Sequence, residues 1–245
     1  MSASGAAIAA QLRVVDAERQ RRIGSPALLA RVTQLKAFQQ RRFSYTYADL
    51  LASARYGAAA RYFLAELYGP GDFTTRDAQF ARVAPTIARL FPEQVADTIA
   101  ILAELHALSE TLDSDTALHL PDGPMTPLDY VRAWHAAGRA PDREHQIELT
   151  LRIAAQLDRV TRMPMLRNAL RLMRGPARAA GLSELQRSLE TGFDVFRDMK
   201  GAQEFIDLIG ARERALAAAL FAAHADESSL HRALAGLAPT GAQAD

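Results

Sequence analysis

The sequence predicts an all-α fold, a single-domain multi-helix bundle of about nine to ten helices. Alanine, leucine and arginine are abundant and valine and isoleucine are few, so the intrinsic preferences favour helix throughout. Apolar residues recur at spacings of three and four, and no segment alternates apolar and polar residues over a useful length. Proline and glycine stand in short joints between these periodic segments, at positions where helices begin and end.

The first two helices are predicted over residues 6–22 and 26–40. Ser25 is suited to cap the second helix, and Pro26 follows at its first position. Residues 41–45 combine two arginines with two aromatic residues. We interpret them as a connector to the next helix.

The third helix, predicted from Tyr47 to Tyr68, is expected to be the central one. Apolar residues occupy nearly all of its surface. Those on its main buried face recur at helical spacing and are Ala52, Tyr56, Ala60, Phe63 and Leu67. Gly69 and Pro70 then end the helix, because glycine favours the left-handed end position and proline cannot continue a helix.

Further helices follow, each bounded by a proline, a glycine or a capping residue. They are predicted over residues 75–90, 92–113, 126–138, 141–162, 164–174, 183–200 and 202–223. Residues 114–125 form the one long loop, Gly175 and Pro176 end a helix, and Ser183 caps the next. The single domain then divides into a basic N-terminal helical hairpin over residues 1–45, a helical core over residues 46–225 and a partly frayed tail over residues 226–245.

The whole chain carries a formal charge of +1, but this charge is unevenly distributed. Residues 1–45 hold eight Lys and Arg against two acids, a balance of +6, and the remaining residues hold 21 against 26, a balance of −5. The near-neutral total gives no general case for binding nucleic acid or a membrane. Nucleic-acid binding stays an alternative, through Arg21, Arg22, Arg41 and Arg42. We favour a solvated basic segment, or one whose charges pair with acids of the same chain.

The absence of cysteine excludes disulfides, thiolate metal sites and cysteine nucleophiles. No apolar run approaches the roughly 18–20 residues that cross a bilayer. The apolar run at the start of the chain is short and no basic residue precedes it, so we expect no signal peptide. The sequence therefore predicts a soluble, cytoplasmic protein that makes no membrane contact.

Residues 62–68 have the sequence YFLAELY and are followed by Gly69 and Pro70. This stretch resembles the bacterial protein family named for its FFLEELY motif, and further similar stretches cover most of the chain after residue 50. The sequence departs from the motif at Tyr62 and Ala65. The resemblance implies a helical protein of uncharacterised activity, and it carries over no catalytic residue.

Packing does not explain Glu66, because it is a carboxylate within an apolar helix. A buried Glu66 needs a partner, which Arg55 or Arg76 can supply. Tyr62 and Tyr68 would complete this polar network, which serves either the structure or a ligand. The alternative places Glu66 on a narrow strip that faces solvent.

Two groups of residues have the chemistry of a metal site in a helix bundle. His106, Glu110 and Asp113 share one helix face at steps of four and three, and Asp142 and His145 stand three apart near the start of another helix. The paired Glu-x-x-His motifs of di-iron bundles are missing. We therefore favour His106 as a satisfied histidine beside the core, with Glu110 and Asp113 in solvent.

The sequence has no Gly-x-Ser-x-Gly elbow and no glycine-rich phosphate loop, so it predicts no catalytic residue and no cofactor. It favours a non-enzymatic protein that binds an apolar ligand or a protein partner, the partner being another protein or a second copy of the chain. The residues that suggest this are the aromatic and methionine side chains Tyr130, Trp134, Met163, Met165 and Met173. The alternatives are nucleic-acid binding and a helix-bundle metalloenzyme, either di-iron-like or with haem held by His106, His135 or His145.

Overall fold

The structure is a computed structural model, which describes residues 3–66, 78–80, 82–83, 93–223, 227–235 and 237. Within these ranges every regular element is a helix, which confirms the predicted all-α class, and the twelve helices there slightly exceed the predicted number. They are α1 (Ala3–Ile23), α2 (Pro26–Thr46), α3 (Ala48–Ala52), α4 (Gly57–Glu66), α6 (Glu93–Ala117), α7 (Pro127–Ala137), α8 (Ala140–Val160), α9 (Pro164–Leu172), α10 (Arg174–Ala179), α11 (Ser183–Asp198), α12 (Gln203–Ala222) and α13 (Glu227–Ala235).

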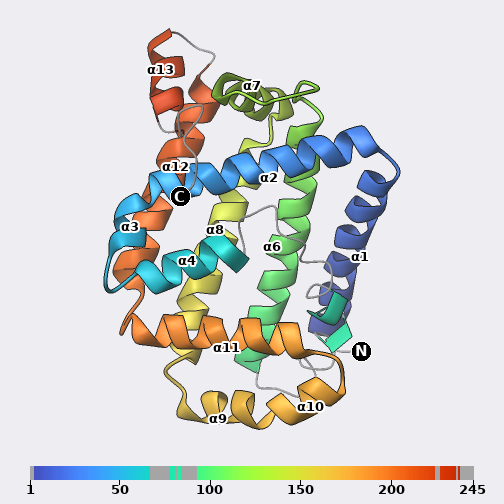
Figure 1. Cartoon of the computed structure of the whole chain (residues 1–245), viewed down its shortest axis with the longest axis vertical. Helices are drawn as coiled ribbons and strands as arrows, with labels where there is room; N and C mark the ends of the chain where they lie inside the picture. The colour runs from blue at the N-terminus through green and yellow to red at the C-terminus, as the bar shows by residue number, and fades with distance from the viewer. Residues whose placement is uncertain are drawn as a thin grey trace.

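The long helices α6 and α8 pack together in the middle of the molecule, and the other helices are arranged around them (Figure 1). α1 packs along α6, and α12 packs along α8. α2 crosses α6 towards the end where α7 and α13 lie, whereas α9, α10 and α11 occupy the opposite end (Figure 1). The basic N-terminal segment is therefore in contact with the middle of the chain.

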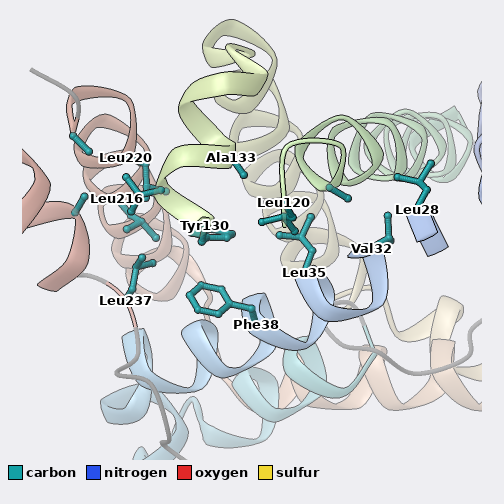
Figure 2. Close-up of a cluster of buried hydrophobic side chains, with 14 residues drawn as sticks. Leu28, Val32, Leu35, Phe38, Leu120, Tyr130, Ala133, Leu216, Leu220 and Leu237 are labelled. Atoms are coloured by element: carbon teal, nitrogen blue, oxygen red, sulfur yellow. The ribbon is translucent and has the colours of Figure 1, made fainter. Parts of the chain in front are cut away.

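One large cluster of buried apolar side chains joins α2, α7 and α12. Figure 2 shows Leu35 and Phe38 of α2 beside Tyr130 of α7, with Leu216 and Leu220 of α12 completing the cluster. The ring centroids of Phe38 and Tyr130 are 4.7 Å apart. Each large side chain buried in this way stabilises the fold by about 1.5–3 kcal/mol.

A second cluster is aromatic and joins α4, α11 and α12. Phe63 of α4 packs edge-on against Phe196 of α11 at 5.8 Å and lies 5.9 Å from the ring of Phe205 of α12. Phe196 and Phe205 are fully buried. This cluster holds the short helix α4 in place.

The prediction of one central helix over residues 47–68 is wrong, because α3 and α4 stand there with a turn between them. Ser53 explains the break: its hydroxyl accepts hydrogen bonds from the amides of Arg55 and Tyr56, each at 3.2 Å. Serine competes in this way with the helical hydrogen bonds of its neighbours. The predicted buried face holds in part: Tyr56, Ala60 and Phe63 are buried, Ala52 is exposed, and Leu67 lies outside the described residues.

Two predicted joints are helical instead. Residues 41–45 lie in α2, where Arg42 and Phe43 are buried and continue its inner face. α6 also continues through the first four residues of the loop predicted over residues 114–125. The hydroxyl of Thr116 donates to the carbonyl one turn earlier, so a polar side chain is buried there with its hydrogen bond made.

The predicted stop at Gly175 and Pro176 is also wrong. α9 ends earlier, at Leu172, and both residues lie in the first turn of α10. Proline is tolerated in a first turn because the amides there have no partner within the helix. Ser183 is the first residue of α11 rather than its cap.

Four other predicted boundaries are confirmed. Ser25 caps α2, and Thr126 forms a reciprocal capping box with Asp129 at the start of α7. Gly138 ends α7 with φ 64°, and Gly201 separates α11 from α12 with φ 119°. Only glycine adopts these left-handed conformations without steric cost.

Some predictions lie outside the described residues. These are the Gly69–Pro70 stop, most of the helix over residues 75–90 and the end of the frayed tail, although residues 78–80 and 82–83 are helical. Among the helices that the structure describes, none is long and apolar enough to cross a bilayer.

Candidate functional site

Glu110 of α6 is the centre of a buried ion network. Arg22 of α1 forms an ion pair with its carboxylate, donates to its main-chain oxygen at 2.6 Å, and donates from Nε to Ser114 Oγ at 3.0 Å. Lys36 Nζ of α2 lies 2.7 Å from the other carboxylate oxygen. We name Arg22, Lys36, Glu110 and Asp113 the Glu110 network. Because its members come from three helices, it fixes how α1 and α2 lie on α6.

The two carboxylates of this network have opposite pKa shifts. Burial alone would raise the pKa of Glu110, but the charges of Lys36 and Arg22 outweigh it and lower that pKa to about 2. Burial raises the pKa of Asp113. Lys36 opposes this rise but does not cancel it, because its Nζ lies 3.8 Å from Asp113 Oδ2. Gln39 Nε2 donates to Asp113 Oδ1 at 3.3 Å. Glu110 is therefore the fixed negative charge of the network.

Arg42 forms a second buried ion pair, with Glu213 of α12. Its side chain is 5% exposed, and Tyr47 donates to the same carboxylate oxygen at 2.6 Å. A buried pair of this kind specifies the position of α2 on α12, since separating it leaves an uncompensated charge.

The four predicted nucleic-acid contacts therefore divide into two kinds. Arg22 and Arg42 are buried in ion pairs and present no guanidinium to a phosphate backbone. Arg21 contacts Glu18 at 3.3 Å and Asp115 at 3.7 Å, and the guanidinium of Arg41 lies 5.8 Å from the ring centre of Phe38. Much of the basic N-terminal charge is thus neutralised by acids of the same chain.

The predicted metal ligands lie in three separate groups. His106 Nε2 is 3.8 Å from Glu110 Oε1 at the edge of the Glu110 network, Asp142 pairs with Arg139, and His145 Nε2 lies 2.7 Å from Glu104 Oε1. Among the described residues, no three His, Asp or Glu side chains are placed to hold a metal ion.

The expectation that Glu110 and Asp113 lie in solvent is wrong, because both are buried. The spacing on α6 did not reveal the two cations, Arg22 and Lys36, that pair with Glu110. They lie more than seventy residues away in the sequence, at separations of 88 and 74. The signal that pointed to them was the opposite charge balance of the N-terminal segment and the rest of the chain.

The predicted polar network of the FFLEELY-like stretch is only partly described, because Tyr68, Arg76 and the side chain of Glu66 lie outside the described residues. Arg55 and Tyr62 both donate to main-chain carbonyls, Arg55 at the end of α11 and Tyr62 within it. Arg55 donates to the carbonyls of Met199 and Gly201, at 3.0 and 3.1 Å, and so caps the C-terminus of α11; Tyr62 donates to that of Ser188 at 3.2 Å.

Exposed apolar side chains are concentrated on α9, just before its start and at its junction with α10. Of the ten large apolar side chains exposed among the described residues, four lie within residues 163–173. We name this surface the α9–α10 face, formed by Met163, Met165, Leu172 and Met173 together with Leu189 of α11. Met165 is 75% exposed and Leu172 is 78% exposed. Tyr130 and Trp134, in contrast, pack in the core beside Phe38 and Phe221.

The same segment is strongly basic. Residues 161–182 contain five arginines and no acid. Arg162 contacts Asp158 of α8, and Arg167 and Arg174 contact Asp194 and Glu190 of α11, but these ion pairs are partly exposed to solvent. The α9–α10 face therefore combines exposed apolar side chains with arginines, three of which form solvent-exposed ion pairs with acids of neighbouring helices.

A family model described as "Domain of unknown function (DUF8198)" matches residues 18–227. The chain belongs to this family. Comparison with curated proteins and with solved structures finds no match. The DUF8198 region begins inside α1, so it includes Arg22 and the whole Glu110 network as well as the α9–α10 face.

Proposed function

We propose that this DUF8198 protein is a non-enzymatic binding module, and that its α9–α10 face binds an acidic amphipathic segment of another protein. The observation that carries the proposal is the exposure of Met165 and Leu172 on a helix flanked by arginines. Contiguous exposed apolar surface rimmed by polar groups marks interaction sites on soluble proteins.

The apolar part of the face suits a protein partner. Met163, Met165 and Met173 have flexible, polarisable side chains that adapt to the shape of what they contact. Methionine-rich surfaces bind amphipathic helices in grooves or on faces of this kind. An extended phosphate backbone would leave these side chains in water, so a protein partner fits the face better than nucleic acid.

The charge of the face selects an acidic partner. The five arginines of residues 161–182 would repel the same face of a second copy, so self-association through this surface is disfavoured. Carboxylates of a partner would complement them and exclude basic or neutral competitors.

Selection from a displayed library of random peptides about 16 residues long, enough for a helix of roughly 24 Å, tests the proposal. We expect enrichment of peptides with apolar residues at helical spacing and acidic residues between them. Binding of a selected peptide should fall at least tenfold on Met165→Ser/Leu172→Ser and should weaken as salt is raised, because its arginine contacts are exposed.

The matched control is Ile23→Ser/Leu118→Ser, which removes two exposed apolar side chains elsewhere on the surface. It should bind the selected peptide as the unmodified protein does. Equal binding by both double variants would contradict the proposal. Binding of phosphatidylglycerol vesicles or duplex DNA through Met165 and Leu172, without peptide binding, would assign the face to a membrane or to nucleic acid instead.

A further inference from the structure

We infer a second binding site, for a small aliphatic ammonium ion, in a hollow between α1, α6 and α8. The hollow has a volume of about 240 Å³. It is lined by Gln11, Val14, Glu104, Ala107, Leu108, Thr111, Arg139 and His145. Neither the Glu110 network nor the α9–α10 face includes any of these residues, so the inference is independent of the proposed function.

The polar feature of the hollow is the contact between His145 and Glu104. His145 Nε2 lies 2.7 Å from Glu104 Oε1, and their side chains are 43% and 39% exposed. A carboxylate accepts about four hydrogen bonds, so one contact with an imidazole leaves most of the capacity of Glu104 open. The ammonium group of a ligand can donate to these oxygens from the hollow.

The charges around the hollow favour a cation. Among the described residues Arg139 is the one guanidinium that lines it, and it is held by ion pairs with Asp115 and Asp142. The lining residues and the acids in direct ion pairs with them amount to one arginine and four acids: Arg139, Glu104, Asp115, Asp142 and Glu148. This excess of negative charge attracts a small cation and repels an anion.

The walls favour a short hydrocarbon chain on that cation. Val14, which is 40% exposed, lines the hollow from α1, and Ala107 and Leu108 line it from α6. Ligand pockets for drug-sized molecules measure about 300–1,000 Å³, so this smaller hollow suits a compact ligand. A primary amine with a chain of about four carbons places its ammonium group at Glu104 and its methylenes at Val14.

Titration of the purified full-length chain with n-butylammonium chloride tests the inference. We expect a dissociation constant on the order of 1 mM, with amide and imidazole chemical-shift changes confined to Val14 and His145 and their neighbours. Glu104→Gln removes the charge and keeps the shape, and it should weaken binding at least tenfold. Glu144→Gln is the matched control, because Glu144 is an exposed carboxylate on α8 that pairs with Arg214.

A second variant keeps the inference testable if Glu104→Gln does not fold. Val14→Arg places a guanidinium over the hollow without altering the His145–Glu104 contact, and it too should weaken binding at least tenfold. Thermal unfolding of each variant checks that it is folded. The inference is overturned if n-butylammonium does not bind, if butyrate or n-butanol binds as well, or if the folded Glu104→Gln and Val14→Arg variants bind like the unmodified chain.

Discussion

The Glu110 network and the α9–α10 face are both built from basic segments, but they use their charges in opposite ways. In the first, Arg22 and Lys36 pair with a carboxylate of α6, and Arg22 and that carboxylate are buried among neighbouring helices. In the second, the segment holds five arginines and no acid, and its apolar side chains remain exposed. The first arrangement holds helices of the fold together, whereas the second leaves a surface available to bind another molecule.

The energetics of the two regions differ for the same reason. Removing one partner of a buried ion pair leaves an unpaired charge and destabilises a protein by about 3–5 kcal/mol. An exposed pair such as Arg174–Glu190 contributes roughly 0–1 kcal/mol. The arginines of the α9–α10 face can therefore exchange an internal carboxylate for one on a partner at little cost.

Glu110→Gln should have the largest effect on stability. The substitution keeps the size of the side chain but leaves Arg22, which is 6% exposed, without a counter-charge. We expect the free energy of unfolding to fall by about 3–5 kcal/mol in urea titrations. Glu144→Gln, which breaks an exposed pair, should change it by less than about 1 kcal/mol. Equal losses of unfolding free energy in the two variants would contradict the claim that the buried pair stabilises the fold more than the exposed pair.

Stability should also decline at acid pH through Glu110. Its folded pKa of about 2 lies below its ordinary value of 4.5, so its contribution is present above about pH 4.5 and is lost as the pH falls towards 2. That loss amounts to roughly 3 kcal/mol. Asp113 acts in the opposite sense: burial raises its pKa, so its contribution is greatest below its ordinary value of 3.8 and is lost as the pH rises.

Unfolding free energies of the unmodified chain and of Glu110→Gln, measured between pH 2 and pH 7, separate these contributions. The variant lacks the Glu110 carboxylate, so the two curves should converge at low pH. Curves that stay parallel over the whole range would assign the acid loss to other groups.

The sequence predicted the helical class and many boundaries because those signals are local. Ser25, Thr126, Gly138 and Gly201 act on the backbone within a few residues, so the pattern of neighbours is sufficient to identify their roles. The break at Ser53 was missed because a serine hydroxyl competes with a helix only through the amides it happens to reach.

The candidate site was less predictable, because it depends on contacts between distant segments. The spacing of His106, Glu110 and Asp113 on one helix face is compatible with a metal site or with an ion network, and only the packing of α1 and α2 decides which cations surround Glu110. The methionines of residues 163–173 were recognised as available for a partner, but their exposure depends on what lies beneath α9 and α10. Tyr130 and Trp134, with similar chemistry, are part of the core instead.

The most direct test of this account is a paired measurement on Met165→Ser/Leu172→Ser. Because both side chains are exposed, the free energy of unfolding should change by no more than about 0.5 kcal/mol for each substitution, while affinity for a selected acidic peptide falls at least tenfold. That result would show that Met165 and Leu172 contribute to binding a partner and not to the stability of the fold. A loss of several kcal/mol of stability with peptide binding unchanged would instead show that α9 needs these side chains for folding, and would contradict the account.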